Sequence, residues 1–462
     1  MAQSPAITYY DLIPSQNSMY YMFKFSLHKN VMQIPSSITT DTRLDIDVLK
    51  QAMKIELDRN DSLRLRFQRS GDTIRQYFLP AVPMKEIPVV TFSSKEQEEE
   101  YLSADAQKSV RFLRGETFRM VIFTNSEGHT GIYFNVSHII MDAIGIGVFY
   151  ADLFAVYDAL KTGKELPPPL ERYEDAIKND LAYLKNEKKY NRDKEFFIDY
   201  WSNHGKPFYA GVHGPGLLLK QRKKYNEPDL RVPDAYDLIH DKCDIMRLHV
   251  EKDQAQKIFD YCRATNTAPE NILLLGLRTH CSAINFRTDD TLQIVMCSRR
   301  ATLAAKHMSG CLAQPLQLHT VIPEDKTFRE ALDVMFQVRT QLYRRADFPY
   351  MHARKLQMDI LNYRNSQGPS CMMFSWLPLV FPEFNGIHFS FRSHNPGRYI
   401  MPMYVFAVPT MEDGGLDMYY LYRTSYITKD HITALHNNTI KVLLEGIENP
   451  QITVGELLDS IS

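Results

Sequence analysis

Three features that would narrow the function of a chain this long are missing from this sequence of 462 residues. Its first residues carry no basic start followed by an apolar run, so no signal peptide is predicted, and no apolar run looks long enough to span a bilayer. The 54 lysines and arginines balance the 55 aspartates and glutamates, which argues against a nucleic-acid partner. We therefore expect a cytoplasmic protein with no membrane span.

Cysteine is scarce, and its spacing matches no pattern of zinc ligands. Several cysteines lie in apolar runs such as residues 294–297, which is typical of reduced thiols in a core. The sequence therefore predicts no metal site. The cysteines are Cys243, Cys262, Cys281, Cys297, Cys311 and Cys371.

Local excesses of positive charge occur in two clusters, at residues 220–224 and 185–189. Such runs are typical of solvated faces, and this is the interpretation we favour. The alternative is a docking surface for an acidic carrier protein or for a nucleotide phosphate.

Helix and strand signals alternate along the chain from its start. Residues 20–27 alternate as in a strand, residues 44–53 have helical spacing, and residues 63–67 alternate again. Hydrophobic residues make up 44% of the chain, which is enough for one two-lobed unit or for two to three domains. The mixture favours an α/β or α+β fold. Later elements expected are strands at 291–297, 371–379 and 403–422, and helices from 252, through 273–280, and at 327–344 and 432–446.

A candidate connector follows the proline run at residues 167–169. A long charged helical pattern comes next and ends in a Gly and Pro pair at 214–215, as between two lobes. We predict a first lobe over residues 1–170, a linker over 171–215 and a second lobe over 216–462.

The stretch around His138 has the pattern of a functional loop. Residues 118–123 and 131–136 read as two strands joined by a turn, Asp142 is placed to cap a following helix, and Gly163 follows its last apolar turn. His138 then lies between a strand and a helix, where an imidazole can act as a general base. The alternative is an ordinary loop histidine beside an aspartate that only caps the helix. Ser137 lacks the Gly-x-Ser-x-Gly surroundings of a serine nucleophile.

The residues from Ser137 to Asp142 also carry a resemblance. Ser-His-Ile-Ile-Met-Asp resembles the His-His-x-x-x-Asp-Gly signature of the condensation domains of nonribosomal peptide synthetases and of related thioester-dependent acyltransferases with the chloramphenicol acetyltransferase-like fold. Further stretches follow in that family's order, and together they cover nearly the whole chain. They are residues 59–67, 173–175, 199–201, 298–300 with Gly310, and 414–458.

The chain departs from the family pattern at three positions. Ser137 replaces the first His, Ala143 replaces the Gly after the Asp, and Gly145 replaces the Ser usual three residues after the Asp. The second His, to which the family's catalytic role is assigned, is intact as His138. The Asp-Phe-Gly-Trp-Gly motif of the plant acyl-CoA branch is absent, which places the chain nearer the condensation-type branch. The departures leave open a catalytically inactive binding protein.

The resemblance implies two lobes, each a mixed sheet flanked by helices, with the active site in the cleft between them. It implies an acyl group carried as a phosphopantetheine thioester, on a carrier protein or coenzyme A, and an amine or alcohol as acceptor. No permanently bound cofactor is implied, and a monomer is expected because the lobes form an internal pair. A weaker alternative is thioester hydrolysis, with water as the acceptor.

The resemblance also assigns roles to single residues. His138 is the expected general base or positioning residue, and Asp142 is expected to hold the loop through an ion pair with Arg300 of the second lobe, with Arg299 in reserve. Ser137, Ser375 and Trp376 are possible substrate contacts. For all three, the alternative is an ordinary strand or core position.

Overall fold

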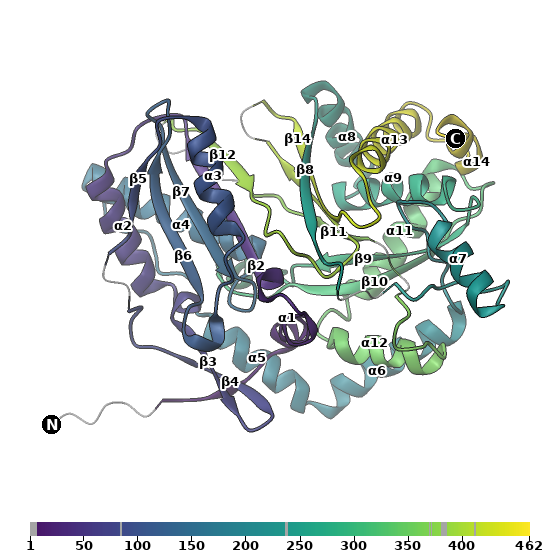
Figure 1. The fold of residues 1–462 in the computed structure, drawn as a ribbon, viewed down its shortest axis with the longest axis horizontal. Helices are drawn as coiled ribbons and strands as arrows, with labels where there is room; N and C mark the ends of the chain where they lie inside the picture. Colours follow the sequence, from purple (N-terminus) through teal and green to yellow (C-terminus); the bar gives the residue numbers. More distant parts are fainter. Residues whose placement is uncertain are drawn as a thin grey trace. The chain divides into compact units, whose positions relative to one another are not determined.

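The computed structural model describes residues 7–83, 86–235, 239–368, 370, 372–379, 386–410 and 413–462. The chain divides into two compact units (Figure 1). The first unit consists of Met1–Glu187, Ser298–Ala313 and Leu379–Arg398, and the second of Lys188–Cys297, Gln314–Pro378 and Tyr399–Ser462.

The first unit contains a five-stranded sheet with the order β12-β2-β7-β6-β5 and a three-stranded sheet with the order β1-β4-β3. Its strands are β1 (Tyr10–Asp11), β2 (Gln33–Thr40), β3 (Leu65–Ser70), β4 (Thr73–Phe78), β5 (Val89–Thr91), β6 (Phe118–Thr124), β7 (Thr130–Ser137) and β12 (Phe389–Ser393). Its helices are α1 (Pro14–Phe25), α2 (Ile46–Arg59), α3 (Lys95–Ala106), α4 (Ala143–Thr162), α5 (Tyr173–Lys185) and α10 (Leu303–Lys306).

The element that leads to the candidate site is β7, which is buried along its whole length. It pairs antiparallel with β6, and the rings of the diagonal neighbours Phe118 and Phe134 pack edge-on at 5.9 Å between centroids. Phe149 of α4 packs on Phe134 at 4.9 Å, which fixes the helix against the strand that precedes it. The predicted strands at 118–123 and 131–136 are confirmed.

Strand β12 returns to the first unit from late in the chain. It pairs antiparallel with β2, from Phe389 opposite Thr40 to Ser393 opposite Ser36. This pairing explains why the compact units are discontinuous in sequence, whereas the division we predicted, into 1–170, 171–215 and 216–462, is continuous.

The second unit has a six-stranded mixed sheet with the order β10-β9-β11-β13-β14-β8, in which β11 runs parallel to both of its neighbours. Its strands are β8 (Cys243–Val250), β9 (Asp290–Cys297), β10 (Gln314–Val321), β11 (Met373–Trp376), β13 (Met403–Pro409) and β14 (Leu416–Arg423). Its helices are α6 (Glu187–His204), which begins at the boundary, α7 (Gly216–Tyr225), α8 (Lys252–Thr265), α9 (Pro269–Ala283), α11 (Phe328–Tyr343), α12 (Tyr350–Ile360), α13 (Lys429–Glu448) and α14 (Val454–Ser460).

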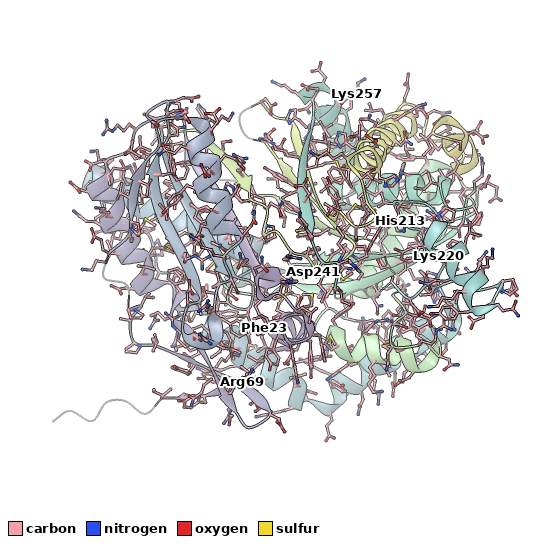
Figure 2. The ribbon with its side chains drawn as sticks, viewed as in Figure 1. Phe23, Arg69, His213, Lys220, Asp241 and Lys257 are labelled. Atoms are coloured by element: carbon pink, nitrogen blue, oxygen red, sulfur yellow. The ribbon has the colours of Figure 1, made fainter. Side chains whose placement is uncertain are left out.

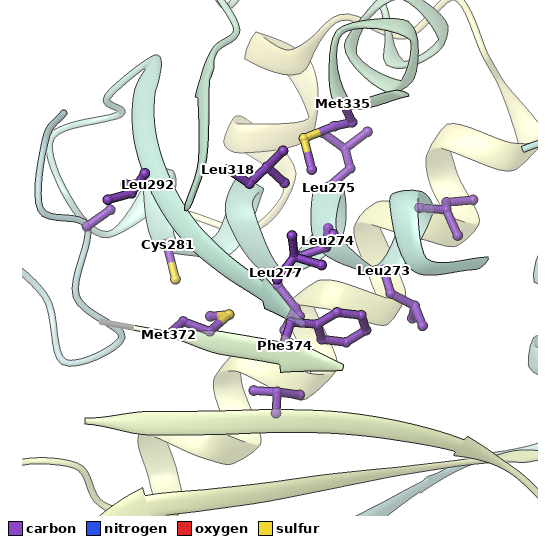
Figure 3. Packing of buried hydrophobic residues seen from close by; sticks show 14 of the residues in the cluster. Leu273, Leu274, Leu275, Leu277, Cys281, Leu292, Leu318, Met335, Met372 and Phe374 are labelled. Carbon is purple, nitrogen blue, oxygen red and sulfur yellow. The ribbon is translucent and has the colours of Figure 1, made fainter. Parts of the chain in front are cut away.

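The core of the second unit is built around α9, which has almost no exposed face. Leu274 and Leu277 pack in one cluster with Phe374 of β11 (Figure 3). On another side, a Cβ at Gly276 would lie 2.9 Å from the Thr439 side chain of α13, so glycine permits the close approach of the two helices. The expected mixed architecture, with sheets flanked by helices, is confirmed in each unit.

The strand predicted at residues 20–27 is wrong, because this stretch belongs mainly to helix α1. Pro14 occupies the first turn, and the Gln16 side chain accepts from the backbone N–H of Ile13 at 3.1 Å, which starts the helix. Ser15, Ser18 and Met19 face inward at helical spacing. The alternating aromatic residues that suggested a strand lie largely on the outer side of the helix. Their spacing therefore does not reflect which side of the segment is buried.

Helix α4 differs from the expectation that no apolar run reaches the length of a bilayer. By length and composition, Ala143–Thr162 is long and apolar enough to cross a membrane. However, 56% of the tested stretch is buried inside the structure, and a core helix passes the same test. The helix is therefore weak evidence for a membrane span.

Five of the six cysteines are buried, as expected for core thiols, while Cys371 lies outside the described residues. The basic cluster at 220–224 lies on α7, where Lys220, which is labelled in Figure 2, is exposed, as are Lys223 and Lys224. Arg222 instead donates to the carbonyl of Leu230 at 2.9 Å. The cluster at 185–189 is exposed as well.

Candidate active site

His138 follows the last residue of β7 and precedes the cap of α4. Its backbone N–H donates to the carbonyl of Met32 at 2.8 Å, while that of Ser137 donates to Thr117 at 2.9 Å. Its side chain is partly buried, and the ring Nδ1 lies 3.9 Å from Sγ of Cys311. The predicted position between a strand and a helix is thus confirmed.

The surroundings of His138 favour its neutral form. Burial lowers the pKa of the imidazole below its usual 6.5, although the charge of Asp142 and a hydrogen bond from the ring to the backbone of His138 itself act in the opposite direction. A hydrogen bond that raises a histidine pKa has the ring N–H as donor, and Nδ1 is the ring nitrogen nearer the main chain. A neutral ring that donates from Nδ1 has its lone pair on Nε2.

Asp142 is a buried carboxylate whose oxygens accept four hydrogen bonds. Burial by itself raises the pKa of Asp142, but the neighbouring Arg300 and the backbone N–H donors outweigh it, so the pKa lies below its usual value. Asp142 is therefore ionised at neutral pH and fully satisfied. The donors are Gly145 N at 2.8 Å to Oδ1, and Arg300 Nη1 at 2.9 Å, Leu312 N at 2.8 Å and Ala313 N at 2.9 Å to Oδ2.

The predicted ion pair between Asp142 and Arg300 is present, and both side chains are almost completely buried. Arg300 also donates from Nη2 to the carbonyl of Gly310 at 2.9 Å. We expected this arginine in the second lobe, but it belongs to Ser298–Ala313, a late segment that packs with the first unit. Arg299, the reserve candidate, instead forms a two-point ion pair with Asp180 of α5.

A close backbone contact between Gly145 and Gly310 explains one departure from the family pattern. A Cβ at Gly145 would lie 2.8 Å from the carbonyl oxygen of Gly310, closer than real side chains approach. Gly310 itself has φ +131° and lies against the ring of Tyr173, so its backbone has little room to withdraw. Glycine at 145 is therefore what this packing requires, rather than a sign of a decayed site.

Sequence reasoning missed two residues that shape the site, Tyr173 and Cys311. Tyr173 packs on Gly310 and donates its hydroxyl to the carbonyl of Cys311 at 2.9 Å. The only sequence signal for Tyr173 was its place in a family-like stretch, and Cys311 read as an ordinary core thiol.

The three possible substrate contacts lie in different units. Ser137 is buried in β7 of the first unit, whereas Ser375 and Trp376 lie in β11 of the second. The hydroxyl of Tyr404 donates to Oγ of Ser375 at 2.8 Å. Trp376 packs against the core of its unit and meets the ring of Phe259 edge-on at 6.3 Å. These contacts fix both side chains in place.

The part of the chain that the structure describes contains no group of three or more His, Cys, Asp or Glu side chains arranged for a metal ion. An imidazole such as that of His138 can transfer protons and form hydrogen bonds near neutral pH.

Comparison with known proteins identifies relatives along the whole chain. The family model for the condensation domain matches residues 6–459. Surfactin synthase subunit 1 from Bacillus subtilis is 20% identical over 464 residues, which cover 98% of this chain and 12% of the relative. Cyclosporin synthetase from Tolypocladium inflatum is 21% identical over 456 residues, which cover 95% of this chain and 3% of the relative. The chain thus spans a small part of the length of these proteins.

Solved structures with the same fold include the following three. The first condensation domain of the calcium-dependent antibiotic synthetase has a TM-score of 0.80 at 16% identity, covering 97% of this chain and 98% of that one. The starter condensation domain of rhizomide synthetase, in complex with C8-CoA, has a TM-score of 0.79 at 16% identity and 97% coverage of both chains. The X-domain from teicoplanin biosynthesis has a TM-score of 0.71 at 16% identity and 98% coverage of both. These likenesses confirm the fold class that the resemblance implied.

Proposed function

Since the chain belongs to the condensation-domain family, we propose that it transfers an acyl group from a phosphopantetheine thioester to an amine or alcohol, forming an amide or an ester. The observation that carries this proposal is the position of His138 directly after β7, where burial lowers the pKa of its imidazole and so favours the neutral form. A base in that state is ready to accept a proton at neutral pH.

The proposed reaction transfers one proton twice, first to His138 and then to the leaving group. The acceptor nitrogen or oxygen attacks the thioester carbonyl while its proton passes to Nε2 of His138. The tetrahedral intermediate then collapses, the carbon–sulfur bond breaks, and the proton moves from Nε2 to the departing thiolate. General-base help of this kind contributes about two to four orders of magnitude, and alignment of the two substrates can contribute as much or more.

Asp142 and Arg300 have a supporting role in this scheme. The ion pair is buried and the carboxylate is saturated by donors, so Asp142 has no capacity to take a proton from substrate. Together they hold the loop that carries His138. We propose Ser137, Ser375 and Trp376 as substrate contacts.

The donor is proposed to be an acyl-carrier protein or coenzyme A, and no permanently bound cofactor is required. The complex of the rhizomide starter domain with C8-CoA supports a thioester of this chemistry. The same scheme is compatible with the cytoplasmic location and the monomeric state expected from the sequence.

The experiment measures thiol release from a panel of acyl-CoA and acyl-carrier thioesters, with amine and alcohol acceptors, for wild type and for His138→Ala. We expect acceptor-dependent release that the substitution reduces by about two orders of magnitude or more. His129→Ala is the control, because that partly exposed ring contacts Glu127 at the turn between β6 and β7. Equal release by wild type and His138→Ala would rule out the assigned base.

A second candidate function is binding without turnover. It is favoured by the TM-score of 0.71 with the X-domain from teicoplanin biosynthesis, a domain that also has a solved complex with the protein OxyB. The replacement of the first signature His by Ser137 is compatible with it. This candidate would be favoured if no thioester of the panel gave acceptor-dependent thiol release while the protein still bound a carrier protein or an acyl-pantetheine analogue.

A further inference from the structure

Cys311 is held by hydrogen bonds on both sides of its α-carbon. Its carbonyl accepts from the hydroxyl of Ser15 at 2.8 Å and from that of Tyr173 at 2.9 Å. The carbonyl of Gly310 before it accepts from the backbone N–H of Asp142 at 3.2 Å, and Leu312 after it donates to the Asp142 carboxylate. The main chain at 311 therefore has little freedom.

This fixed main chain directs the Cys311 side chain to His138. Sγ lies 3.9 Å from Nδ1, within the range of a sulfur hydrogen bond, and Cys311 has no exposed surface. We propose that Cys311 is a positioning residue that holds the His138 ring with its proton on Nδ1 and with Nε2 available to the acceptor. The proposal rests on the function proposed above and adds a residue to it.

A thiol suits this position because it remains uncharged. Burial raises the pKa of Cys311 far above its usual value, so the side chain is S–H at any working pH. A neutral neighbour does not stabilise imidazolium, whereas a carboxylate or thiolate there would raise the pKa of His138. The same protonated, inaccessible state makes Cys311 unsuitable as a nucleophile.

The sulfur also contributes through its size and its weak acceptor character. It is a buried, weakly polar atom 3.9 Å from Nδ1, and with Nδ1 protonated the sulfur would be the acceptor of that hydrogen bond. The charge of Asp142 acts on the ring as well, and that carboxylate is paired with Arg300. Removing the sulfur should therefore change the tautomer and the pKa of the His138 ring.

The test measures the tautomer and pKa of His138 by NMR of protein labelled in the histidine rings, with the His138→Gln variant used to assign the resonance. Wild type should show the Nδ1–H tautomer. In Cys311→Ala, we expect a mixture of tautomers and a pKa that rises toward 6.5, because water gains access to Nδ1. In Cys311→Ser, the tautomer populations and the pKa of His138 should lie between those of wild type and Cys311→Ala. Cys262→Ala, which removes another buried thiol from α8, is the control and should match wild type.

A kinetic measurement complements the NMR. With the best thioester and acceptor, kcat of Cys311→Ala should fall about 3- to 10-fold with little change in KM, because the substitution affects the base and not the substrates. The same tautomer and pKa in wild type and Cys311→Ala would overturn the proposal, whatever the kinetics. If no protein turns over any substrate, the acyltransferase function fails while the NMR still decides whether Cys311 positions His138.

Discussion

At the scale of single residues, the lowered pKa of His138 sets how the reaction should depend on pH. In the proposed mechanism the base form is the active form, and burial lowers the pKa, so activity should be unchanged as pH falls from 8 to the usual histidine value of about 6.5. It should decline only below that value. The measurement is kcat/KM for one thioester and one acceptor from pH 4.5 to 8, on free enzyme. A half-maximal rate above pH 6.5 would contradict the assigned environment.

Asp142 gives a second prediction at this scale, one that concerns stability. In Asp142→Asn the buried guanidinium of Arg300 loses its counter-ion, and an amide cannot accept all of the donors that converge on this side chain. We expect the free energy of unfolding to fall by about 3–5 kcal/mol, measured by urea denaturation. Asp45→Asn is the matched control, because Asp45 also caps a helix and pairs with a cation, Lys161, but at the surface. If Asp142→Asn lost no more unfolding free energy than Asp45→Asn, the buried ion pair would contribute no more to stability than the surface pair.

The ion pair between Asp142 and Arg300 could be predicted from the sequence, whereas the contacts of Cys311 could not. The spacing of Arg300 and Gly310 in a family-like stretch pointed to the pair. Cys311 meets His138 because the hydroxyls of Ser15 and Tyr173, far away in sequence, hold its carbonyl. Such contacts through the main chain leave no pattern in side-chain types.

At the scale of secondary-structure elements, the first turn of α4 depends on the close contact between Gly145 and Gly310. Gly145→Ser would introduce the residue usual in the family, yet its Cβ would lie 2.8 Å from the Gly310 carbonyl oxygen and 2.9 Å from its nitrogen. We expect a lower melting temperature and lower activity, not a gain. Ala143→Gly is the control, since it restores the other family glycine and costs at most about 1 kcal/mol of helix propensity. A more active or more stable Gly145→Ser variant would show that the backbone at 310 can yield.

Arg299 offers a prediction about backbone strain. It has φ +55°, a left-handed conformation that costs an L-residue roughly 1–2 kcal/mol, and its ion pair with Asp180 is nearly buried. Arg299→Ala should lose the pair and retain the cost, whereas Arg299→Gly should lose the pair but relieve the cost. The glycine variant should therefore be about 1 kcal/mol more stable than the alanine variant in urea denaturation. Equal stabilities would mean that the backbone changes conformation once the pair is lost.

Local patterns predicted most elements of the fold but not every one. The helix at 44–53, the strands at 118–123 and 131–136, and the helix at 327–344 emerge because their buried faces have a clear period. Helix α1 was mistaken for a strand because its aromatic residues do not mark the buried face. Strand β12 was missed because its pairing partner β2 lies about 350 residues earlier in the chain, as in Phe389 opposite Thr40.

At the scale of the whole molecule, the histidines that are buried in neutral form should govern stability in acid. His213, His280, His394 and His436 each have a pKa lowered to about 4, mainly by burial. In His280, Nδ1 accepts from the amide of Asn438 at 3.1 Å, so a proton there would place two donors face to face. The unfolded chain would protonate these rings near pH 6.5, whereas the folded protein does so only near pH 4.

The sign of the effect follows from proton uptake. Between about pH 6.5 and 4 the unfolded state binds more protons, so stability falls with falling pH, by up to about 1.4 kcal/mol per pH unit for each histidine. His249 opposes this trend, because its ion pairs with Asp413 and Asp417 raise its pKa against the effect of burial. One opposing histidine against these four leaves a net loss, and the lowered pKa values of His138 and His352 act in the same direction as the four.

We therefore expect the melting temperature, measured by calorimetry, to be nearly constant from pH 8 to 7 and to fall steadily from pH 6.5 to 4.5. Three of the four histidines belong to the second unit, and only His394 belongs to the first. If the units unfold in separate transitions, the transition of the second unit should shift more. His280→Gln should reduce the pH dependence of the free energy of unfolding by up to about 1.4 kcal/mol per pH unit, the contribution of one proton, because an amide at this position does not titrate. A melting temperature that is independent of pH between 6.5 and 4.5 would mean that these rings are protonated in the folded protein.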